Sequence, residues 1–116
     1  YFDSDQYAKA IVAYNKSLEI APGDPRIMTD LGVMYRRNGQ PPKALETFDK
    51  VLQINPRFEQ ALFNKGVVLF YDIKNYEEAF NTWRTLIQVN PNATTPSGSR
   101  ISDLIPQLQN QVTQNK

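Results

Sequence analysis

The chain has 116 residues, of which 41% are hydrophobic and 22% charged, so it can build one modest folded domain and is not a disordered tail. Its 13 basic and 12 acidic residues leave a net charge of +1, which gives no electrostatic basis for binding nucleic acid or an anionic membrane. The sequence has no cysteine and no histidine, which excludes disulfides, thiolate or imidazole chemistry and Cys/His metal sites.

The first predicted element is a helix within residues 1–24. Its apolar positions recur at three- and four-residue intervals and are Tyr7, Ile11, Tyr14 and Leu18. Pro22 follows them and blocks continuation of the helix. The chain opens at Tyr1 without a methionine, so we expect an earlier segment to have preceded it. The apolar face of this helix would then be exposed, and a missing helix, a second copy of the chain or a lattice neighbour would cover it.

Residues 25–58 predict two antiparallel helices. The first is expected from about Pro25 to Arg37, with Asp24 as its N-cap and proline at the first helical position. It ends at Asn38-Gly39, a pair that tolerates the left-handed conformation of a helix cap. Its predicted apolar stripe is Ile27, Met28, Leu31, Met34 and Tyr35.

The second helix of this pair opens at Pro41-Pro42 and is stopped by Pro56. Its predicted buried face is Ala44, Leu45, Phe48, Val51, Leu52 and Ile54. Gly32 lies inside the first helix, where glycine costs roughly 1 kcal/mol relative to alanine. We therefore expect the two helices to approach closely at Gly32, with Ala44 as the small residue facing it.

The same pattern returns in residues 59–92. The matched positions are Gly32 with Gly66, Ala44 with Ala79, Phe48 with Trp83, and Pro56 with Pro91. The two glycines are 34 residues apart and the other three pairs 35, so one extra residue is expected between Gly66 and Ala79. Residues 1–24 match only the second half of the unit, through Ala10, Tyr14 and Pro22. An internal repeat of this length indicates a solenoid of helix pairs.

The segment from residue 93 onward does not repeat the pattern. A loop rich in threonine, serine, proline and glycine is expected over residues 93–99. A helix should follow, with an apolar face made of Ile101, Leu104, Ile105, Leu108 and Val112. Such a helix would cap the stack with its polar side outward. Pro106 leaves two alternatives: either Ser102 is the N-cap and the helix starts near Asp103, or the helix kinks at the proline.

The unit Met28-x-x-Leu31-Gly32-x-x-Tyr35, followed by Ala44-x-x-x-Phe48 and Pro56, resembles the tetratricopeptide-repeat (TPR) family. The third unit departs from the family pattern at Lys65 and Leu69. The resemblance implies an all-α fold, a right-handed superhelical stack of antiparallel helix pairs with a C-terminal capping helix. The expected single domain, 1–116, divides into a truncated first repeat (1–24), a second (25–58), a third (59–92), and a loop with its capping helix (93–116).

The resemblance also implies a concave groove lined by the first helix of each pair. Its predicted residues are Arg26, Thr29, Val33, Arg36 and Arg37 in the second repeat and Gln60, Phe63, Val67, Phe70 and Tyr71 in the third. Asn64 stands where some relatives hold the ligand backbone, whereas Asp30 does not continue that pattern. Thr29 and Val33 replace the Lys and Asn of the family's carboxylate clamp, so we expect no such clamp here.

The sequence therefore predicts a protein-interaction scaffold and no enzyme, with no cofactor and no metal. The partner is expected to be a protein or a peptide with acidic and apolar side chains. The alternative for Arg36 and Arg37 is that they only complement the end of a helix. A regulatory or targeting segment of a larger enzyme and a self-assembly unit remain alternatives. No apolar run approaches the roughly 20 residues that span a bilayer, and the compartment, cytoplasm or periplasm, stays open.

Overall fold

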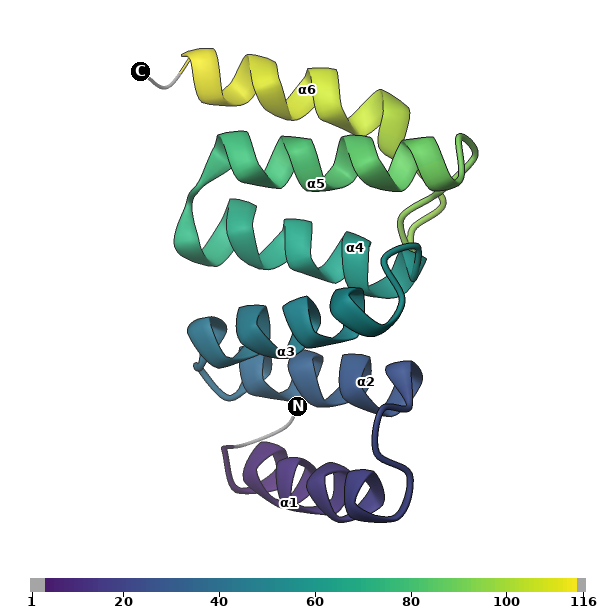
Figure 1. Cartoon of the computed structure of the whole chain (residues 1–116). Helices are drawn as coiled ribbons and strands as arrows, with labels where there is room; N and C mark the ends of the chain where they lie inside the picture. Colours follow the sequence, from purple (N-terminus) through teal and green to yellow (C-terminus); the bar gives the residue numbers. More distant parts are fainter. Residues whose placement is uncertain (1–3, 115–116) are drawn as a thin grey trace.

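The fold is a serial stack in which each helix packs mainly on its neighbours in the sequence (Figure 1). The computed structural model describes residues 4–114. The helices are α1 (Ser4–Ile20), α2 (Pro25–Arg37), α3 (Pro41–Ile54), α4 (Glu59–Val67), the π-helix η1 (Val68–Ile73), α5 (Tyr76–Val89) and α6 (Ile101–Gln114). Among the described residues, the only β-type pairing is an isolated bridge between Thr94 and Arg100. The predicted all-α stack of helix pairs with a terminal helix is confirmed.

The predicted ends of α2 are confirmed. A carboxylate oxygen of Asp24 accepts hydrogen bonds from the backbone N–H groups of Arg26 at 3.0 Å and Ile27 at 3.4 Å. Pro25 occupies the first helical position, where its missing N–H group has no partner to lose. After the helix, Gly39 adopts a φ of 75°, the left-handed conformation that turns the chain into α3.

A Cβ atom would clash at Gly32, as predicted, but the clash is with a side chain and not with the backbone of the second helix or with Ala44. A Cβ atom at Gly32 would overlap the aromatic ring of Phe48. Ala44, on the same helix as Phe48, is fully buried. The space over Gly32 is nevertheless filled by the ring of Phe48 and not by the methyl group of Ala44. The glycine therefore makes room for an aromatic ring, which fills more volume than two small residues facing each other would.

The third repeat uses the same arrangement with a larger ring. A Cβ atom at Gly66 would overlap the indole of Trp83, which is fully buried. The indole N–H donates a hydrogen bond to the backbone carbonyl of Phe63, with a donor–acceptor distance of 3.2 Å. This bond gives the indole N–H of the buried tryptophan the hydrogen-bond partner that a buried donor needs.

The extra residue of the third repeat is accommodated in η1. In the second repeat, the backbone N–H of Gln40 reaches the carbonyl of Tyr35, five residues back. At the matching place, Asn75 reaches Leu69, six residues back. The insertion predicted between Gly66 and Ala79 is confirmed in this way, and it takes the form of one wide helical turn. Lys74 closes that turn with a φ of 65°, at the position that Gly39 holds one repeat earlier.

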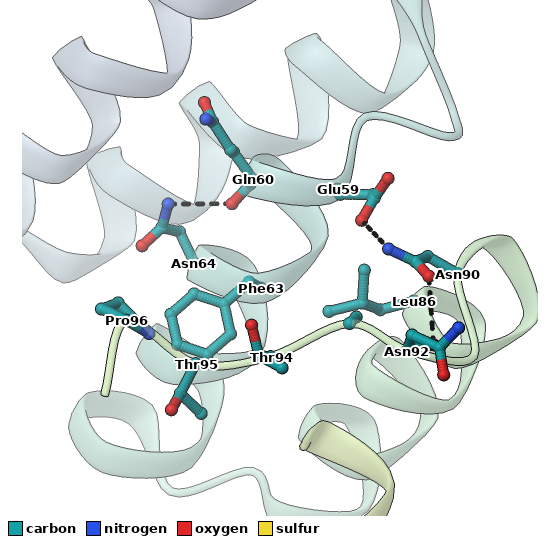
Figure 2. A pocket seen from close by; sticks show the side chains of 11 residues that line it. Glu59, Gln60, Phe63, Asn64, Leu86, Asn90, Asn92, Thr94, Thr95 and Pro96 are labelled. Carbon is teal, nitrogen blue, oxygen red and sulfur yellow. Dashed lines mark hydrogen bonds between the residues drawn. The ribbon is translucent and has the colours of Figure 1, made fainter. Parts of the chain in front are cut away.

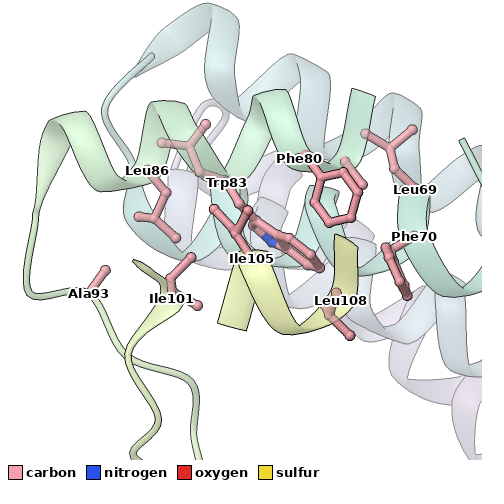
Figure 3. Close-up of a cluster of buried hydrophobic side chains, with 11 residues drawn as sticks. Leu69, Phe70, Phe80, Trp83, Leu86, Ala93, Ile101, Ile105 and Leu108 are labelled. Atoms are coloured by element: carbon pink, nitrogen blue, oxygen red, sulfur yellow. The ribbon is translucent and has the colours of Figure 1, made fainter. Parts of the chain in front are cut away.

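The terminal helix α6 packs on α5 and closes the core (Figure 3). Its buried residues are Ile101, Ile105 and Leu108, with Leu104 and Val112 partly buried against the same cluster. The predicted capping face is therefore confirmed. Of the two alternatives raised by Pro106, a helix capped by Ser102 is wrong, because α6 already begins at Ile101 and the carbonyl of Arg100 accepts from Asp103 and Leu104. The helix runs on through Pro106, which is exposed.

Two expectations about exposure need correction. Ile54 was expected on the buried face of α3 but is 53% exposed, because it is the last residue of the helix and extends past the packed part. In α1, the predicted apolar stripe of Tyr7, Ile11, Tyr14 and Leu18 is half-buried, since α1 packs on α2. Tyr1 lies outside the described residues.

Candidate functional site

The first helices of the second and third repeats lie next to each other. Besides the contacts within each helix pair, α2 contacts α4 directly, so the two helices share one surface. Four of the predicted groove residues are exposed: Arg26, Arg37, Gln60 and Tyr71. Five are half-buried: Val33, Arg36, Phe63, Asn64 and Val67. This surface combines basic, amide and aromatic side chains that a partner can reach.

Two of the predicted groove residues are wrong. Thr29 is 2% exposed, and its hydroxyl donates to the carbonyl of Pro25 at 2.6 Å. Phe70 is 8% exposed, and its ring lies 4.9 Å from that of Tyr76 and 5.8 Å from that of Trp83, centre to centre. The wide turn of η1 rotates the residues after Gly66 relative to a regular α-helix, so the position expected in the groove faces the core instead.

Arg36 has an intramolecular partner that the sequence analysis did not foresee. Its guanidinium Nε lies 2.5 Å from a carboxylate oxygen of Asp72 in η1, and both side chains are partly exposed. This ion pair joins the end of α2 to the wide turn of the third repeat. Arg36 is therefore already paired within the chain, and its role goes beyond complementing the end of its own helix. The exposed cations of α2 are Arg26 and Arg37.

A cavity of about 420 Å³ opens beside α4 on the same surface (Figure 2). Its lining residues come from the first turns of α4, the end of α5 and the following loop, and they are Glu59, Gln60, Phe63, Asn64, Leu86, Asn90, Asn92, Ala93, Thr94, Thr95 and Pro96. Three of these, Gln60, Phe63 and Asn64, belong to the predicted groove. Glu59 lies beside them at the start of α4, and the other residues of the cavity come from α5 and the loop that follows it, which are remote in the sequence.

Some polar side chains of the cavity lining are hydrogen-bonded within the fold, and others keep an atom that could bond a ligand. Asn90 donates to a carboxylate oxygen of Glu59 at 2.8 Å and accepts from the backbone N–H of Asn92 at 3.0 Å, so both its nitrogen and its oxygen hold the fold. Asn64 donates to the carbonyl of Gln60 at 2.8 Å. Among the described residues its amide oxygen has no partner, and Figure 2 shows this oxygen on the side away from Gln60.

The sequence contained a signal for the missed half of this cavity. Asn55-Pro56-Arg57 and Asn90-Pro91-Asn92 follow matching helices, but a new helix begins after the first and a long polar loop after the second. The greater length of the loop that follows α5 indicates that this loop does more than join two helices. It does not show which surface the segment borders, because that depends on how α5 packs against α4.

Within the described residues, no group of three or more acidic side chains has the arrangement of a metal site. In the same part of the chain, every helix is too short or too polar to cross a membrane.

The sequence matches two family profiles, both described as the tetratricopeptide repeat. One covers residues 1–64 and the other residues 60–93. The matched segments thus include all of the helix pairs, and the terminal loop and α6 lie outside them.

Several curated proteins are similar to the chain. The Hsp70-Hsp90 organizing protein of Triticum aestivum is 30% identical over 91 residues, which are 78% of this chain and 16% of that protein. The photosystem I assembly protein Ycf3 of Acaryochloris marina is 32% identical in an alignment 102 residues long that covers 74% of this chain and 61% of that protein. The chain thus spans only part of the length of these relatives.

Two solved structures share the fold. The first TPR of Spaghetti bound to the HSP90 peptide SRMEEVD superposes with a TM-score of 0.79 at 18% identity, covering 94% of this chain and 82% of that one. The Sgt2 TPR domain of Aspergillus fumigatus gives a TM-score of 0.79 at 24% identity, covering 95% and 72%. At these identities the likeness concerns the fold alone.

Proposed function

The chain belongs to the tetratricopeptide-repeat family, and from that premise we propose that it is a protein-interaction scaffold that binds a peptide on the surface shared by α2 and α4. The observation that carries the proposal is the continuity of this surface: exposed Arg26 and Arg37 lie on α2, and exposed Gln60 and Tyr71 lie on α4 and η1. The similar proteins point the same way, since one solved relative holds a peptide and others are named as organizing or assembly proteins.

The charges on this surface favour a peptide that carries acidic side chains. Arg26 and Arg37 are exposed cations without a partner among the described residues, and Arg–carboxylate pairs with two parallel hydrogen bonds are strong and directional. The surface offers no clamp for a terminal carboxylate at these two positions of α2, because Thr29 is buried and Val33 is apolar. The acidic groups that bind are therefore side chains within the peptide.

We propose that the chain itself catalyses no reaction, as is general for scaffolds built only of helical repeats. The division into repeats at residues 1–24, 25–58 and 59–92 follows the helix pairs and is proposed on that basis. Attachment to an enzyme in a longer protein is the alternative that the length of the relatives leaves open.

Self-association through α1 also stays a prediction. Val12 is 55% exposed and Ile20 is 88% exposed on this helix, so apolar surface is available for contact. Analytical ultracentrifugation of the chain over a range of concentrations measures its self-association. A mass that stays at one chain would contradict the prediction.

Peptides selected from a random phage-displayed library test the main proposal. We expect the selected peptides to contain acidic residues, and we expect the double variant Arg26→Glu, Arg37→Glu to weaken their binding by at least about tenfold, as measured by calorimetry. The control is Lys9→Glu, Lys16→Glu, which makes the same change of charge at exposed positions of α1. Equal weakening by both variants would indicate a general effect of charge and would overturn the proposal, as would a selection without any enriched peptide.

A further inference from the structure

Arg36 differs from the other two arginines of α2 because the chain itself pairs it. Its Nε donates to a carboxylate oxygen of Asp72 in η1, and the two side chains are 36% and 24% exposed. Arg26 and Arg37 have no carboxylate partner in the part of the chain that the structure describes. The charge of one of the three arginines is therefore neutralised from within the chain.

The extra residue of the third repeat makes this contact possible. Residues 33–38 separate Gly32 from the left-handed Gly39, whereas residues 67–73 separate Gly66 from the left-handed Lys74. The shorter segment contains no acidic residue, and the longer one contains Asp72. Figure 1 shows the end of α2 and the turn that leads from α4 into α5 on the same side of the stack. The ion pair thus arises from the insertion and not from the plan that the two repeats share.

Asp72 occupies an edge of the guanidinium that a peptide carboxylate would use. A guanidinium binds a carboxylate most strongly through two parallel N–H bonds, and one of the two edges that can do so includes Nε. Because Asp72 accepts from Nε, its charge also repels a second carboxylate that approaches Arg36. The next residues in the sequence, Arg37 and Tyr71, are exposed, so the pair lies within reach of a peptide on the surface shared by α2 and α4.

The pair is nevertheless open to exchange. Both side chains are partly exposed, so water and salt compete for their charges and the net stabilisation is small. An acidic side chain of a peptide can therefore take the place of Asp72. When a site is free only part of the time, the apparent affinity for its ligand falls by the free fraction.

We infer, on the basis of the proposed function, that Asp72 is an intramolecular competitor of the acidic peptide. It holds Arg36 while the surface is empty and releases Arg36 when a peptide carboxylate arrives. A peptide with an acidic residue at this position then contacts three arginines, after breaking the internal pair. A peptide without one meets only Arg26 and Arg37. Asp72 thus sets how acidic a peptide must be to bind.

Binding of the blocked peptide N-acetyl-tetraglutamate amide to the full chain tests the inference. Asp72→Asn keeps the shape of the side chain and removes its charge. We expect this variant to bind the peptide roughly two- to fivefold more tightly than the natural chain, as measured by NMR titration. In an Arg36→Gln background the same change should have no effect, since no arginine is left to release. A gain that persists in that background would overturn the inference.

A second ion pair between the repeats supplies a matched control. Asp49 of α3 lies 2.7 Å from the ammonium nitrogen of Lys65 in α4. Asp49→Asn therefore removes one negative charge and one ion pair between the same two repeats, but it releases no arginine of α2. We expect a smaller gain from Asp49→Asn than from Asp72→Asn. Equal gains would indicate a general effect of charge or of a looser interface, and they would overturn the inference.

The Nε–H signal of Arg36 in the ¹⁵N-labelled chain gives a readout that needs no peptide. Asp72→Asn should shift this signal in the free chain, because the carboxylate no longer accepts from Nε. Adding the peptide to the natural chain should shift it too, as one carboxylate replaces another. An Arg36 signal that does not respond to Asp72→Asn would overturn the inference, whatever the peptide does.

The outcomes separate this inference from the proposed function. If the peptide binds the natural chain and Asp72→Asn binds it no more tightly, the inference is overturned and the acidic-peptide proposal stands. If the peptide binds neither, the proposal fails and the inference fails with it. Binding to Asp72→Asn alone would support both, and it would show that the internal carboxylate blocks the surface.

Discussion

The two complete helix pairs of this chain follow one plan and differ in a single residue of length. In both pairs a glycine of the first helix lies under an aromatic ring of the second: Gly32 under Phe48, and Gly66 under Trp83. In the α2–α3 pair the first helix ends in a regular α-helical turn, whereas after α4 it widens into η1. The comparison shows that the packing contact is kept while the end of the first helix is free to vary.

The variation has consequences for the surface. The wide turn moves Phe70 into the core and brings Asp72 against Arg36 of the preceding repeat. One inserted residue therefore enlarges the core of the third repeat and pairs a cation of the neighbouring repeat's groove-lining helix. The insertion thus changes which side chains reach the surface of the third repeat, while the arrangement of the helix pair is kept.

The largest expected difference between the two pairs comes from their aromatic residues. Trp83→Ala should lower the free energy of unfolding by about 4 kcal/mol, because it leaves a large cavity and the Phe63 carbonyl loses a hydrogen bond. Phe48→Ala should cost less, since Phe48 lies in a smaller cluster with Ala44 and Val68. Urea unfolding followed by circular dichroism measures both, and a larger cost for Phe48→Ala would reverse the comparison.

Replacing the two glycines by alanine should lower the free energy of unfolding in the same order, with the larger loss in the third repeat, but by less than the aromatic substitutions do. Gly66→Ala forces the indole of Trp83 to move and should cost about 2 kcal/mol, after allowing for the better helix propensity of alanine. Gly32→Ala displaces only the ring of Phe48, which makes no hydrogen bond, and should cost less. Thermal unfolding of the two variants is the measurement. Equal melting temperatures for the two variants would contradict this ranking and would show that displacing the hydrogen-bonded indole costs no more than displacing the ring of Phe48.

The left-handed positions after the first helices should respond in opposite directions. Gly39 has a φ of 75°, so Gly39→Ala should destabilise the chain by about 1 kcal/mol. Lys74 holds the matching position with a φ of 65°, so Lys74→Gly should relieve strain and stabilise by about 0.5 kcal/mol, net of the greater entropy of glycine in the unfolded chain. Both are read from urea unfolding midpoints. A destabilised Lys74→Gly would mean that the lysine side chain contributes more than its backbone costs.

The smallest expected effect belongs to the ion pair that joins the two repeats. A double-mutant cycle with Arg36→Ala and Asp72→Ala should give a coupling of at most about 1 kcal/mol, because both side chains are partly exposed. The coupling should shrink between 50 mM and 1 M salt, since mobile ions screen exposed charges. A coupling that is unchanged by salt would show that the pair is less accessible to solvent than the structure indicates.

Much of the fold could be predicted from the sequence, for local reasons. Asp24-Pro25 and Asn38-Gly39 mark the start and end of α2 through capping chemistry that involves only a few neighbouring residues. The unequal spacing of Gly66 and Ala79 located the inserted residue to within one segment. The groove was harder to predict, because Thr29 and Phe70 were placed in it by register and both are buried. Register does not show how far the neighbouring helices cover Thr29 in the regular helix α2, and it does not describe the wide turn that carries Phe70.

The sequence by itself therefore determined the repeat, the helix ends, the buried aromatic face and the apolar stripe of α6, because each depends on spacing along the chain. Only the tertiary structure decided that Phe48 and not Ala44 covers Gly32, that Asp72 meets Arg36, and that the loop after α5 borders α4. The physical reason is that these contacts join residues from different helices. Their geometry depends on the widened turn of η1 and on how α5 packs against α4, and no pattern within one segment of the sequence contains that information.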